Sequence, residues 1–313
     1  MDTSTKPVLV CMVGLPASGK STIAYNLAME NNYIVFSSDA LREELYLDIN
    51  DQTHNHELFV ELHKRIKTAL KEGNNVVYDA CNLSSKRRVA FLQELNRIPC
   101  RKECIIAATP YEQCLRNNAN RDRHVPDYVI ERMYKSFDTP YYYEGFDRIS
   151  IEYWNGSCNG SLLPMSWALD YQTYNQDNPH HKLALGAHCM EAMYWLYDSD
   201  WFNHDSISTI MKAALIHDCG KPFCRTLKNG KGEITDVAHY YGHEHVGAYD
   251  SLFFTYVAGI NPLFVSALIS NHMKPYVWER DNNEKMYNKY LKLWGDYFMQ
   301  CVMILHEADK AAH

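Results

Sequence analysis

The sequence lacks the features that mark secreted, membrane-bound and zinc-ribbon proteins. None of its ten cysteines forms a C-x-x-C pair, which argues against a ribbon-type metal site. Its apolar runs are all much shorter than a membrane span. Residues 1–6 (MDTSTK) are polar and unlike a signal peptide. We therefore expect a cytoplasmic protein with reduced thiols and no membrane partner.

The sequence also lacks an excess of positive charge, internal repeats and low-complexity tracts. The net charge is −7, so any contact with nucleic acid requires a local basic patch. The length of 313 residues and the apolar fraction of 46% are typical of a globular protein with two domains. These quantities do not predict an oligomeric state.

The sequence contains a complete GxxxxGK[ST] motif, GLPASGKS, at residues 14–21. An apolar segment at 7–13 predicts a buried strand before it, and residues 21–28 predict a helix after it. A glycine-rich turn in this setting is typical of a phosphate-binding loop for ATP or another nucleoside triphosphate, although such a turn also arises by chance. We expect these residues to contact the nucleotide: Gly14, Ser18, Gly19, Lys20, Ser21 and Thr22. Lys20 would reach the β- and γ-phosphates, and the Ser21 hydroxyl would bind Mg²⁺.

The first half of the chain alternates between strand and helix patterns. Further strands are expected at 33–36, 75–79, 103–107 and 148–153, and helices at 56–71, 84–95 and about 125–137. This order predicts an α/β domain, with a parallel sheet and helices on both faces. The segment 155–161 (NGSCNGS) reads as a linker, so we expect domains at 1–155 and 162–313.

The second half has almost only helical patterns. Eleven of the fifteen histidines lie from His180 onward, so a histidine-based site would belong to this all-α domain. The helices are expected at 183–197, 206–216, 247–257, 262–270 and 287–310.

Polar residues follow the second expected strand. Asp39 and Arg42 are three residues apart and share a helix face. A carboxylate beside a phosphate loop could accept the proton of an acceptor hydroxyl, and the arginine could bind an acceptor phosphate. The alternative is that Ser or Asp serves only as a helix N-cap.

Charged residues also follow the third and fourth expected strands. Asp79 ends the third strand and is either a ligand of the Mg²⁺ shell or a turn-forming aspartate. The run 86–88 (KRR) is either a solvated helix face or a nucleic-acid contact. Arg116, Arg121 and Arg123 lie where P-loop kinases carry a lid. Of these, Arg121 is the first and Arg123 the second choice for stabilising the transferring phosphoryl group.

Four segments of the first half, GLPASGKS, SSDALREEL, YDACNLSSKRR and RNNANRDRHVPDYVIERMYKSF, together resemble the 5′-kinase domain of the phage polynucleotide kinase family. The resemblance implies transfer of the ATP γ-phosphate to a 5′-hydroxyl of RNA or DNA. It implies that Lys20 and Ser21 bind phosphate and Mg²⁺, and that Asp39 is the general base. Arg42 would hold the acceptor's 3′-phosphate, and Arg121 would be the lid arginine.

A second constellation lies in the helical half. His217 and Asp218 end an apolar helix in the motif HDCGKP, where they could bind one divalent ion. His188 and Asp309 could complete its shell, and His243 and His272 could form a second metal position. A single histidine on a helix is more often a structural group, and we accept this interpretation for His204 and His245.

This order of histidines and aspartates resembles the HD phosphohydrolase superfamily, an all-helical fold. The resemblance implies hydrolysis of phosphomonoesters or phosphodiesters by one or two ions of Mn, Fe, Co, Ni or Zn, with Asp218 at the reaction centre. His180 and His181 could line the substrate pocket. Lys221 either contacts phosphate or is solvated at the surface.

Together the halves resemble the bacterial bifunctional HD–Pnk end-healing enzymes, with the kinase module placed first. This resemblance implies action on RNA or DNA ends, and on RNA above all. The kinase would phosphorylate a 5′-hydroxyl, and the other module would act as a 2′,3′-cyclic phosphodiesterase and 3′-phosphatase before a partner ligase. Two alternatives stay open. One is a nucleoside-like small-molecule kinase fused to a nucleotidase, and the other is an ATP-sensing module that regulates a hydrolase.

Overall fold

The computed structural model describes residues 6–154, 162–179 and 182–313, and the chain forms two compact units. Unit one comprises Met1–Ile130 and Pro140–Gly156, and unit two comprises Glu131–Thr139 and Ser157–His313. The segment 131–139 therefore packs with unit two although it precedes the last strand of unit one. The expected linker at 155–161 and the histidines His180 and His181 lie outside the described residues.

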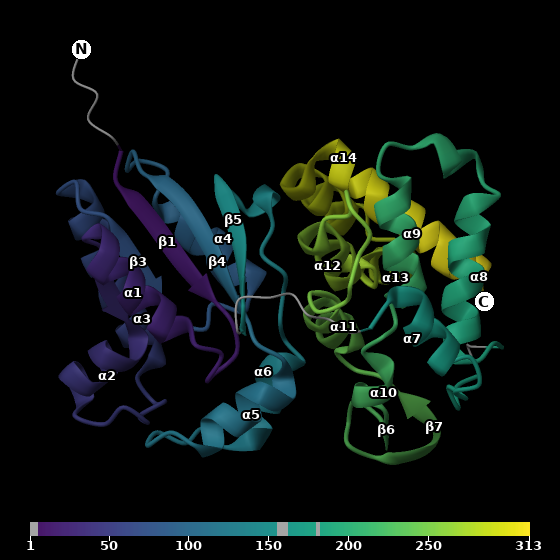
Figure 1. Cartoon of the computed structure of the whole chain (residues 1–313), viewed down its shortest axis with the longest axis horizontal. Helices are drawn as coiled ribbons and strands as arrows, with labels where there is room; N and C mark the ends of the chain where they lie inside the picture. The colour runs from purple at the N-terminus through teal and green to yellow at the C-terminus, as the bar shows by residue number, and fades with distance from the viewer. Residues whose placement is uncertain (1–5, 155–161, 180–181) are drawn as a thin grey trace. The chain divides into compact units, whose positions relative to one another are not determined.

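Unit one is built on a five-stranded sheet (Figure 1). Its strands run parallel in the order β2-β3-β1-β4-β5. The strands are β1 (Val8–Val13), β2 (Ile34–Ser37), β3 (Val76–Asp79), β4 (Arg101–Ala108) and β5 (Arg148–Tyr153). Every residue of β1 is buried, because a central strand of a parallel sheet is covered on both faces. The predicted parallel α/β sheet is confirmed.

Helices flank this sheet and connect its strands. They are α1 (Lys20–Asn31), α2 (Ser38–Tyr46), α3 (Asn55–Lys71), α4 (Ser85–Glu94), α5 (Tyr111–Ala119), α6 (Asp127–Tyr134) and the 3₁₀ turn η1 (Tyr142–Glu144). Helix α3 shows the expected periodicity, with Leu58, Leu62 and Ile66 buried four residues apart. Because the strands are parallel, the segments that follow β1, β2, β3 and β4 all lie at the carboxyl edge of the sheet.

Unit two is mainly helical and also contains a β-hairpin. Its helices are α7 (Pro164–Asp170), α8 (Leu185–Tyr197), α9 (Ile207–Ile216), α10 (Lys221–Cys224), α11 (His243–Ser251), α12 (Pro262–Asn271), α13 (Lys274–Arg280) and α14 (Glu284–Ala311), with a 3₁₀ turn η3 (Asp200–Asn203). The strands β6 (Thr226–Lys228) and β7 (Ile234–His239) pair antiparallel. The expectation of an all-α domain was therefore wrong at this hairpin, and α11 begins four residues before the expected helix. No described helix is both long and apolar enough to cross a membrane.

Candidate nucleotide and metal sites

The phosphate-loop motif lies between β1 and α1, at the carboxyl edge of the sheet. Gly14 is required by close packing, because a Cβ there would lie 2.7 Å from Ser18 Oγ and 2.9 Å from the Ala107 carbonyl oxygen. Gly19 has space around it, but its φ of 88° is a left-handed conformation that favours glycine. Both glycines of the motif thus serve the backbone path of the loop.

The two reactive side chains of the motif are held inside this loop. Lys20 is buried, and its Nζ donates to the Leu15 carbonyl oxygen over 2.6 Å. The Ser21 hydroxyl donates to Asp79 Oδ2 over 2.8 Å. Asp79, at the end of β3, thus meets the hydroxyl that is expected to bind Mg²⁺. A serine hydroxyl beside a strand-end carboxylate is the donor pair that holds Mg²⁺ in P-loop proteins.

Three side chains that the sequence analysis did not single out hold the loop backbone in place. Thr109 Oγ1 donates to the Ser18 carbonyl oxygen over 2.9 Å, and Asn117 Nδ2 donates to that of Ala17 over 3.0 Å. Asn82 Nδ2 donates to the Met12 carbonyl oxygen over 2.9 Å. These three bonds use carbonyl oxygens and no N–H group, whereas the N–H groups of Gly14 and Ser18 already pair with the carbonyl oxygens of Cys81 and Leu15. The motif alone could not indicate these partners, because they come from later segments of the chain, Asn117 from α5 and the other two from the segments after β3 and β4.

Asp39 lies in the first turn of α2, between two arginines. Arg42 Nη1 donates to Asp39 Oδ1 over 3.0 Å, and Arg123 Nη1 donates to Asp39 Oδ2. Asp39 remains 44% exposed, whereas Arg42 is 6% exposed and also donates to Asn55 Oδ1 over 2.9 Å. The N-cap of this helix is Ser37, whose hydroxyl accepts from the Ala40 N–H. Asp39 is therefore not needed as a cap and is available to an incoming group.

The structure separates the three arginines of the expected lid. Arg123 pairs with Asp39 on the acceptor side, and its Nη2 donates to the Ile49 carbonyl oxygen over 3.3 Å. Arg121 Nε donates to Asn118 Oδ1 over 3.1 Å, while its buried Nη2 has no hydrogen-bond partner among the described residues. Arg116 is exposed on α5 and donates to Gln113. Each of the two arginines thus has one buried nitrogen without a hydrogen bond among the described residues, Nη2 in Arg121 and Nε in Arg123, and Arg123 alone contacts Asp39.

The basic run at 86–88 is not one surface patch. Lys86 and Arg87 are exposed, but Arg88 is buried and forms a two-pronged ion pair with Glu144 over 2.7 Å at each oxygen. Arg88 Nη1 also donates to the carbonyl oxygens of Asn82 and Leu83, over 2.7 and 2.9 Å. Arg88 thus fixes the segment after β3 and is not exposed to a nucleic acid. The sequence analysis offered a solvated helix face or a nucleic-acid contact, and both interpretations were wrong for Arg88.

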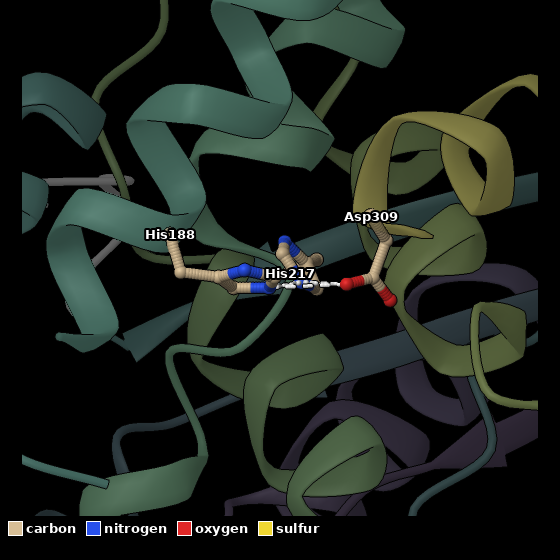
Figure 2. A group of neighbouring side chains, drawn as sticks. All are labelled: His188, His217 and Asp309. Atoms are coloured by element: carbon tan, nitrogen blue, oxygen red, sulfur yellow. Dashed lines mark hydrogen bonds and ion pairs between the residues drawn. The ribbon is translucent and has the colours of Figure 1, made fainter. Parts of the chain in front are cut away.

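In unit two, three of the expected metal ligands converge from three helices (Figure 2). His188 lies on α8, His217 follows the end of α9, and Asp309 lies on α14. His188 Nε2 is 3.0 Å from Asp309 Oδ1, and His217 Nε2 is 3.3 Å from the same oxygen. The two imidazole Nε2 atoms are 3.3 Å apart. All three side chains are buried.

The other three expected ligands form a neighbouring group around Asp218. His243 Nε2 lies 3.2 Å from Asp218 Oδ1, and His272 Nε2 lies 3.9 Å from the same oxygen. The second oxygen, Asp218 Oδ2, faces His217 Nε2 at 3.4 Å and His188 Nε2 at 3.6 Å. Asp218 therefore contacts both groups, one through each oxygen, as a carboxylate shared by two ions would.

The hydrogen bonds of the four histidines test whether a metal ion fits. Each donates its Nδ1–H to a backbone carbonyl oxygen, because a carbonyl can only accept. The distances are 3.2 Å for His188 to Ala312, 2.7 Å for His217 to Ala214, 2.8 Å for His243 to Tyr240 and 2.7 Å for His272 to Ile269. In the neutral imidazole this leaves Nε2 with the lone pair, and the buried Nε2 atoms of His243 and His272 make no hydrogen bond with the described residues. Such backbone bonds orient metal-binding imidazoles, so the donor set fits divalent ions.

The charges within the cluster also favour a bound cation. Burial lowers the pKa of His217, but the carboxylates of Asp218 and Asp309 outweigh it and raise that pKa well above its usual value. Burial also works against the charge of Asp218, yet Lys221 and His217 hold its pKa well below the usual range. Burial and the charges of His217 and His243 lower the pKa of His272 to about 4. The cluster thus keeps two buried carboxylates charged and attracts positive charge between them.

Lys221 is part of this cluster and is not solvated at the surface. It is buried, and its Nζ lies 2.6 Å from Asp218 Oδ2 and donates to Gln176 Oε1 over 2.8 Å. Gly220 of the same motif has a φ of −77°, so a left-handed backbone conformation does not explain the glycine at this position. A Cβ on Gly220 would lie 2.2 Å from the His243 carbonyl oxygen. This glycine lets the HD segment pack directly on the start of α11.

The histidines that we expected to be structural have local partners. His204 Nδ1 accepts from the Ser206 N–H over 3.1 Å, and its ring stacks on Tyr297. His245 Nδ1 donates to the Phe137 carbonyl oxygen over 3.1 Å. These contacts account for both residues without a ligand.

Comparisons with known proteins agree with the fold of unit one. Residues 9–140 match the family model described as AAA domain. The L-seryl-tRNA(Sec) kinase of Methanococcus maripaludis is 29% identical over 144 residues, which are 42% of this chain and 53% of that protein. The chain thus spans about half the length of this curated relative.

Solved structures are similar over part of the chain. A chain of the Pnkp1/Rnl/Hen1 RNA repair complex is 23% identical, with a TM-score of 0.34, over 41% of this chain and 42% of that chain. A gluconokinase from Sinorhizobium meliloti is 15% identical, with a TM-score of 0.37, over 47% of this chain and 83% of that chain. The family match, the observed sheet and the phosphate loop together show that unit one has a P-loop fold.

Proposed function

We propose that this protein repairs nucleic-acid ends, RNA above all, with two separate activities. Unit one would phosphorylate a 5′-hydroxyl with ATP and Mg²⁺, and unit two would open a 2′,3′-cyclic phosphate and remove the resulting phosphate. The observation that carries the proposal is the set of four buried histidines in unit two, each with its Nδ1 on a backbone carbonyl oxygen and its Nε2 toward Asp218 or Asp309. The phosphate loop of unit one would act on the 5′ end of a broken strand, and the histidine cluster of unit two would act on the 3′ end.

In unit one, the residues around Asp39 support acceptance of a hydroxyl. The Asp39 carboxylate is partly exposed at the carboxyl edge of the sheet, where the phosphate loop also lies. It would take the proton of the acceptor hydroxyl while Arg42 and Arg123 hold it in place and bind acceptor anions. The free Nη2 of Arg121 would donate to the phosphoryl group in transfer. Lys20 would neutralise charge on the β- and γ-phosphates.

In unit two, His188, His217, Asp218 and Asp309 would hold one ion, and Asp218, His243 and His272 would hold a second. Such ions lower the pKa of bound water and stabilise the charge of a leaving oxygen. The protein's own contribution is to exclude water and to fix each imidazole through its backbone hydrogen bond. Lys221 would limit the negative charge of Asp218 and attract an incoming phosphate.

The choice of a nucleic acid as substrate rests on chemistry at both sites. Two arginines beside the proposed base suit an acceptor that carries its own negative charge, as a nucleotide chain does. The seryl-tRNA kinase relative is named for an RNA-linked acceptor. A 5′-phosphate and a free 3′-hydroxyl are what a ligase joins, so we propose a ligase as the functional partner. The nine described cysteines are all free, which suits the reducing cytoplasm that we propose.

The test uses one RNA oligonucleotide with a 5′-hydroxyl and a 2′,3′-cyclic phosphate. The full chain is incubated with this RNA, ATP, Mg²⁺ and one of Mn²⁺, Co²⁺, Ni²⁺ or Zn²⁺, and mass spectrometry reads both ends. We expect gain of a 5′-phosphate and opening or loss of the cyclic phosphate. A matching DNA strand and a free nucleoside 3′-phosphate serve as competing acceptors.

Two variants assign each activity to its site. Lys20→Ala should abolish phosphoryl transfer and leave hydrolysis unchanged, and His217→Ala should do the reverse. Loss of both activities in either folded variant would contradict the two-site proposal. If the RNA stays unchanged at both ends while a free nucleoside is phosphorylated, the acceptor is a small molecule. ATP binding without transfer to any acceptor would instead favour an ATP-sensing role.

A further inference from the structure

One polar group beside the metal cluster has no role among the ligands discussed above. Helix α13 carries Tyr276, and the hydroxyl of this tyrosine is buried without a hydrogen-bond partner among the described residues. The Tyr276 ring lies 6.4 Å from the ring of His313, which itself lies 4.9 Å from the His188 ring and donates from Nδ1 to the Asp309 carbonyl oxygen over 3.0 Å, so Tyr276 lies beside the cluster. Buried hydroxyls are almost always paired in folded proteins, so this one lacks an acceptor that the working site would supply.

The ring of Tyr276 is held in a fixed direction. It meets the His306 ring edge to face, with the centroids 4.4 Å apart and the planes at 85°. His306 is itself buried, and its Nε2 lies 2.9 Å from Glu279 Oε1. Because the ring is held on one side by this buried histidine, the hydroxyl at its far end keeps its position. A fixed donor is what a site needs in order to orient a ligand.

Asp309 is the carboxylate that acts most strongly on this hydroxyl, and one of its two oxygens is already in use. Asp309 Oδ1 is shared by His188 Nε2 at 3.0 Å and His217 Nε2 at 3.3 Å. A tyrosine hydroxyl keeps its proton at neutral pH and can therefore donate a hydrogen bond. A phosphate held at the cluster would bring several strong acceptor oxygens to this place.

We propose that Tyr276 is a substrate-binding residue of unit two, and that its hydroxyl donates a hydrogen bond to a phosphate oxygen of the bound ester. The inference rests on the proposed hydrolase function of this unit. It assigns the site a phosphate-anion contact that is independent of the metal ligands. The substrate class is a phosphomonoester or phosphodiester anion.

The experiment compares the full-length protein with its Tyr276→Phe variant, which removes only the hydroxyl. Tyr197→Phe is the matched control, because Tyr197 is exposed on α8 of the same unit. Metal content is measured by elemental mass spectrometry after loading with Mn²⁺. Binding of inorganic phosphate to the metal-loaded proteins is then measured by calorimetry, together with kcat and KM for the cyclic-phosphate RNA.

We expect Tyr276→Phe to keep its metal, to weaken phosphate binding about five- to ten-fold, and to lower kcat/KM by at least that factor. The control should match the wild type. If Tyr276→Phe loses metal, the hydroxyl serves to position Asp309 and the proposal is wrong. Unchanged phosphate binding and unchanged kcat/KM would also overturn it. If the wild type itself takes up no metal, the hydrolase half of the proposed function fails as well, so the two failures are distinguishable.

Discussion

At the scale of single residues, the direction of each imidazole decides what the metal cluster can do. The order of His188, His217 and Asp309 along the chain indicates a ligand set, but it does not say which ring nitrogen points inward. In the structure, hydrogen bonds to backbone carbonyl oxygens determine which ring nitrogen points inward. Those of Ala214 and Ile269 lie one helical turn before His217 and His272, at the ends of α9 and α12. Helix ends leave carbonyl oxygens unpaired, and here these oxygens select the tautomer whose Nε2 could bind a metal.

The two lid arginines should have separable effects on phosphoryl transfer. Arg121→Ala should lower kcat about 10²- to 10³-fold with little change in the acceptor KM, because its free buried donor suits the transferring group. Arg123→Ala should mainly raise the acceptor KM, about ten-fold, because Arg123 contacts Asp39. Steady-state kinetics with a 5′-hydroxyl oligonucleotide check both. Arg116→Ala is the control, and equal effects of the first two variants would contradict this division.

Asp250 on α11 predicts a pH-dependent stability of unit two. Burial raises its pKa to about 7, against a hydrogen bond from the Tyr134 hydroxyl that lowers it. The ordinary pKa of an aspartate is 3.8, so the native state keeps a proton that the unfolded chain has lost. Stability from this group is therefore full below about pH 4 and is lost as the pH rises toward 7.

Asp250→Asn should remove this dependence, since the amide stays neutral at every pH. Relative to the variant, the wild type should lose on the order of 2–4 kcal/mol of unfolding free energy between pH 4 and pH 8. Urea unfolding at several pH values measures the difference. If the two proteins have parallel pH profiles, Asp250 is ionised in the native state.

At the scale of elements, the sequence predicted the sheet well because its strands are short apolar runs bounded by polar turns. The predicted strand at 148–153 coincides with β5. The hairpin of β6 and β7 was missed although Asn229 and Gly230 form a turn signal, because its strands are short and only half apolar. The burial of Arg88 could not be predicted, because its partner Glu144 lies 56 residues away.

Removal of the Arg88 guanidinium should lower the unfolding free energy of unit one more than removal of a surface charge would. Arg88→Met leaves Glu144 buried without a counter-charge and frees the carbonyl oxygens of Asn82 and Leu83. We expect a loss of about 3–5 kcal/mol in the unfolding free energy and weaker ATP binding, because the same segment accepts the Gly14 N–H.

Chemical denaturation and a fluorescent ATP analogue measure these two effects. Arg87→Met is the matched control, since Arg87 is exposed on the same helix and should change stability by less than about 0.5 kcal/mol. Equal stability of the Arg87 and Arg88 variants would show that the buried ion pair contributes little.

At the scale of the whole molecule, the chain forms two units with a discontinuous division. The segment 131–139 leaves unit one through α6 and packs in unit two, where Thr139 Oγ1 bonds to Ser266 Oγ over 2.7 Å. The chain returns at Pro140 to complete the sheet with β5. No local pattern in the sequence indicates such an excursion, because helix periodicity reports that a face is buried and not which unit covers it.

Two units with separate cores and separate ligands should respond to those ligands separately. A ligand that binds only the folded state stabilises it by about 2.7 kcal/mol at a hundred times its Kd. A non-hydrolysable ATP analogue with Mg²⁺ should therefore raise the melting temperature of unit one alone. Mn²⁺ should raise that of unit two alone, because its buried carboxylates and Nε2 lone pairs exist together only when the helices are packed.

Scanning calorimetry of the full chain measures both shifts, and two variants identify the transitions. Lys20→Ala should remove the shift caused by the nucleotide, and His217→Ala should remove the shift caused by the metal. Chelation of the metal should return unit two to its lower melting temperature and leave the nucleotide-bound unit one unchanged. If each ligand raises both transitions equally, the units unfold together, and binding at one site must then favour the other, since linkage is reciprocal.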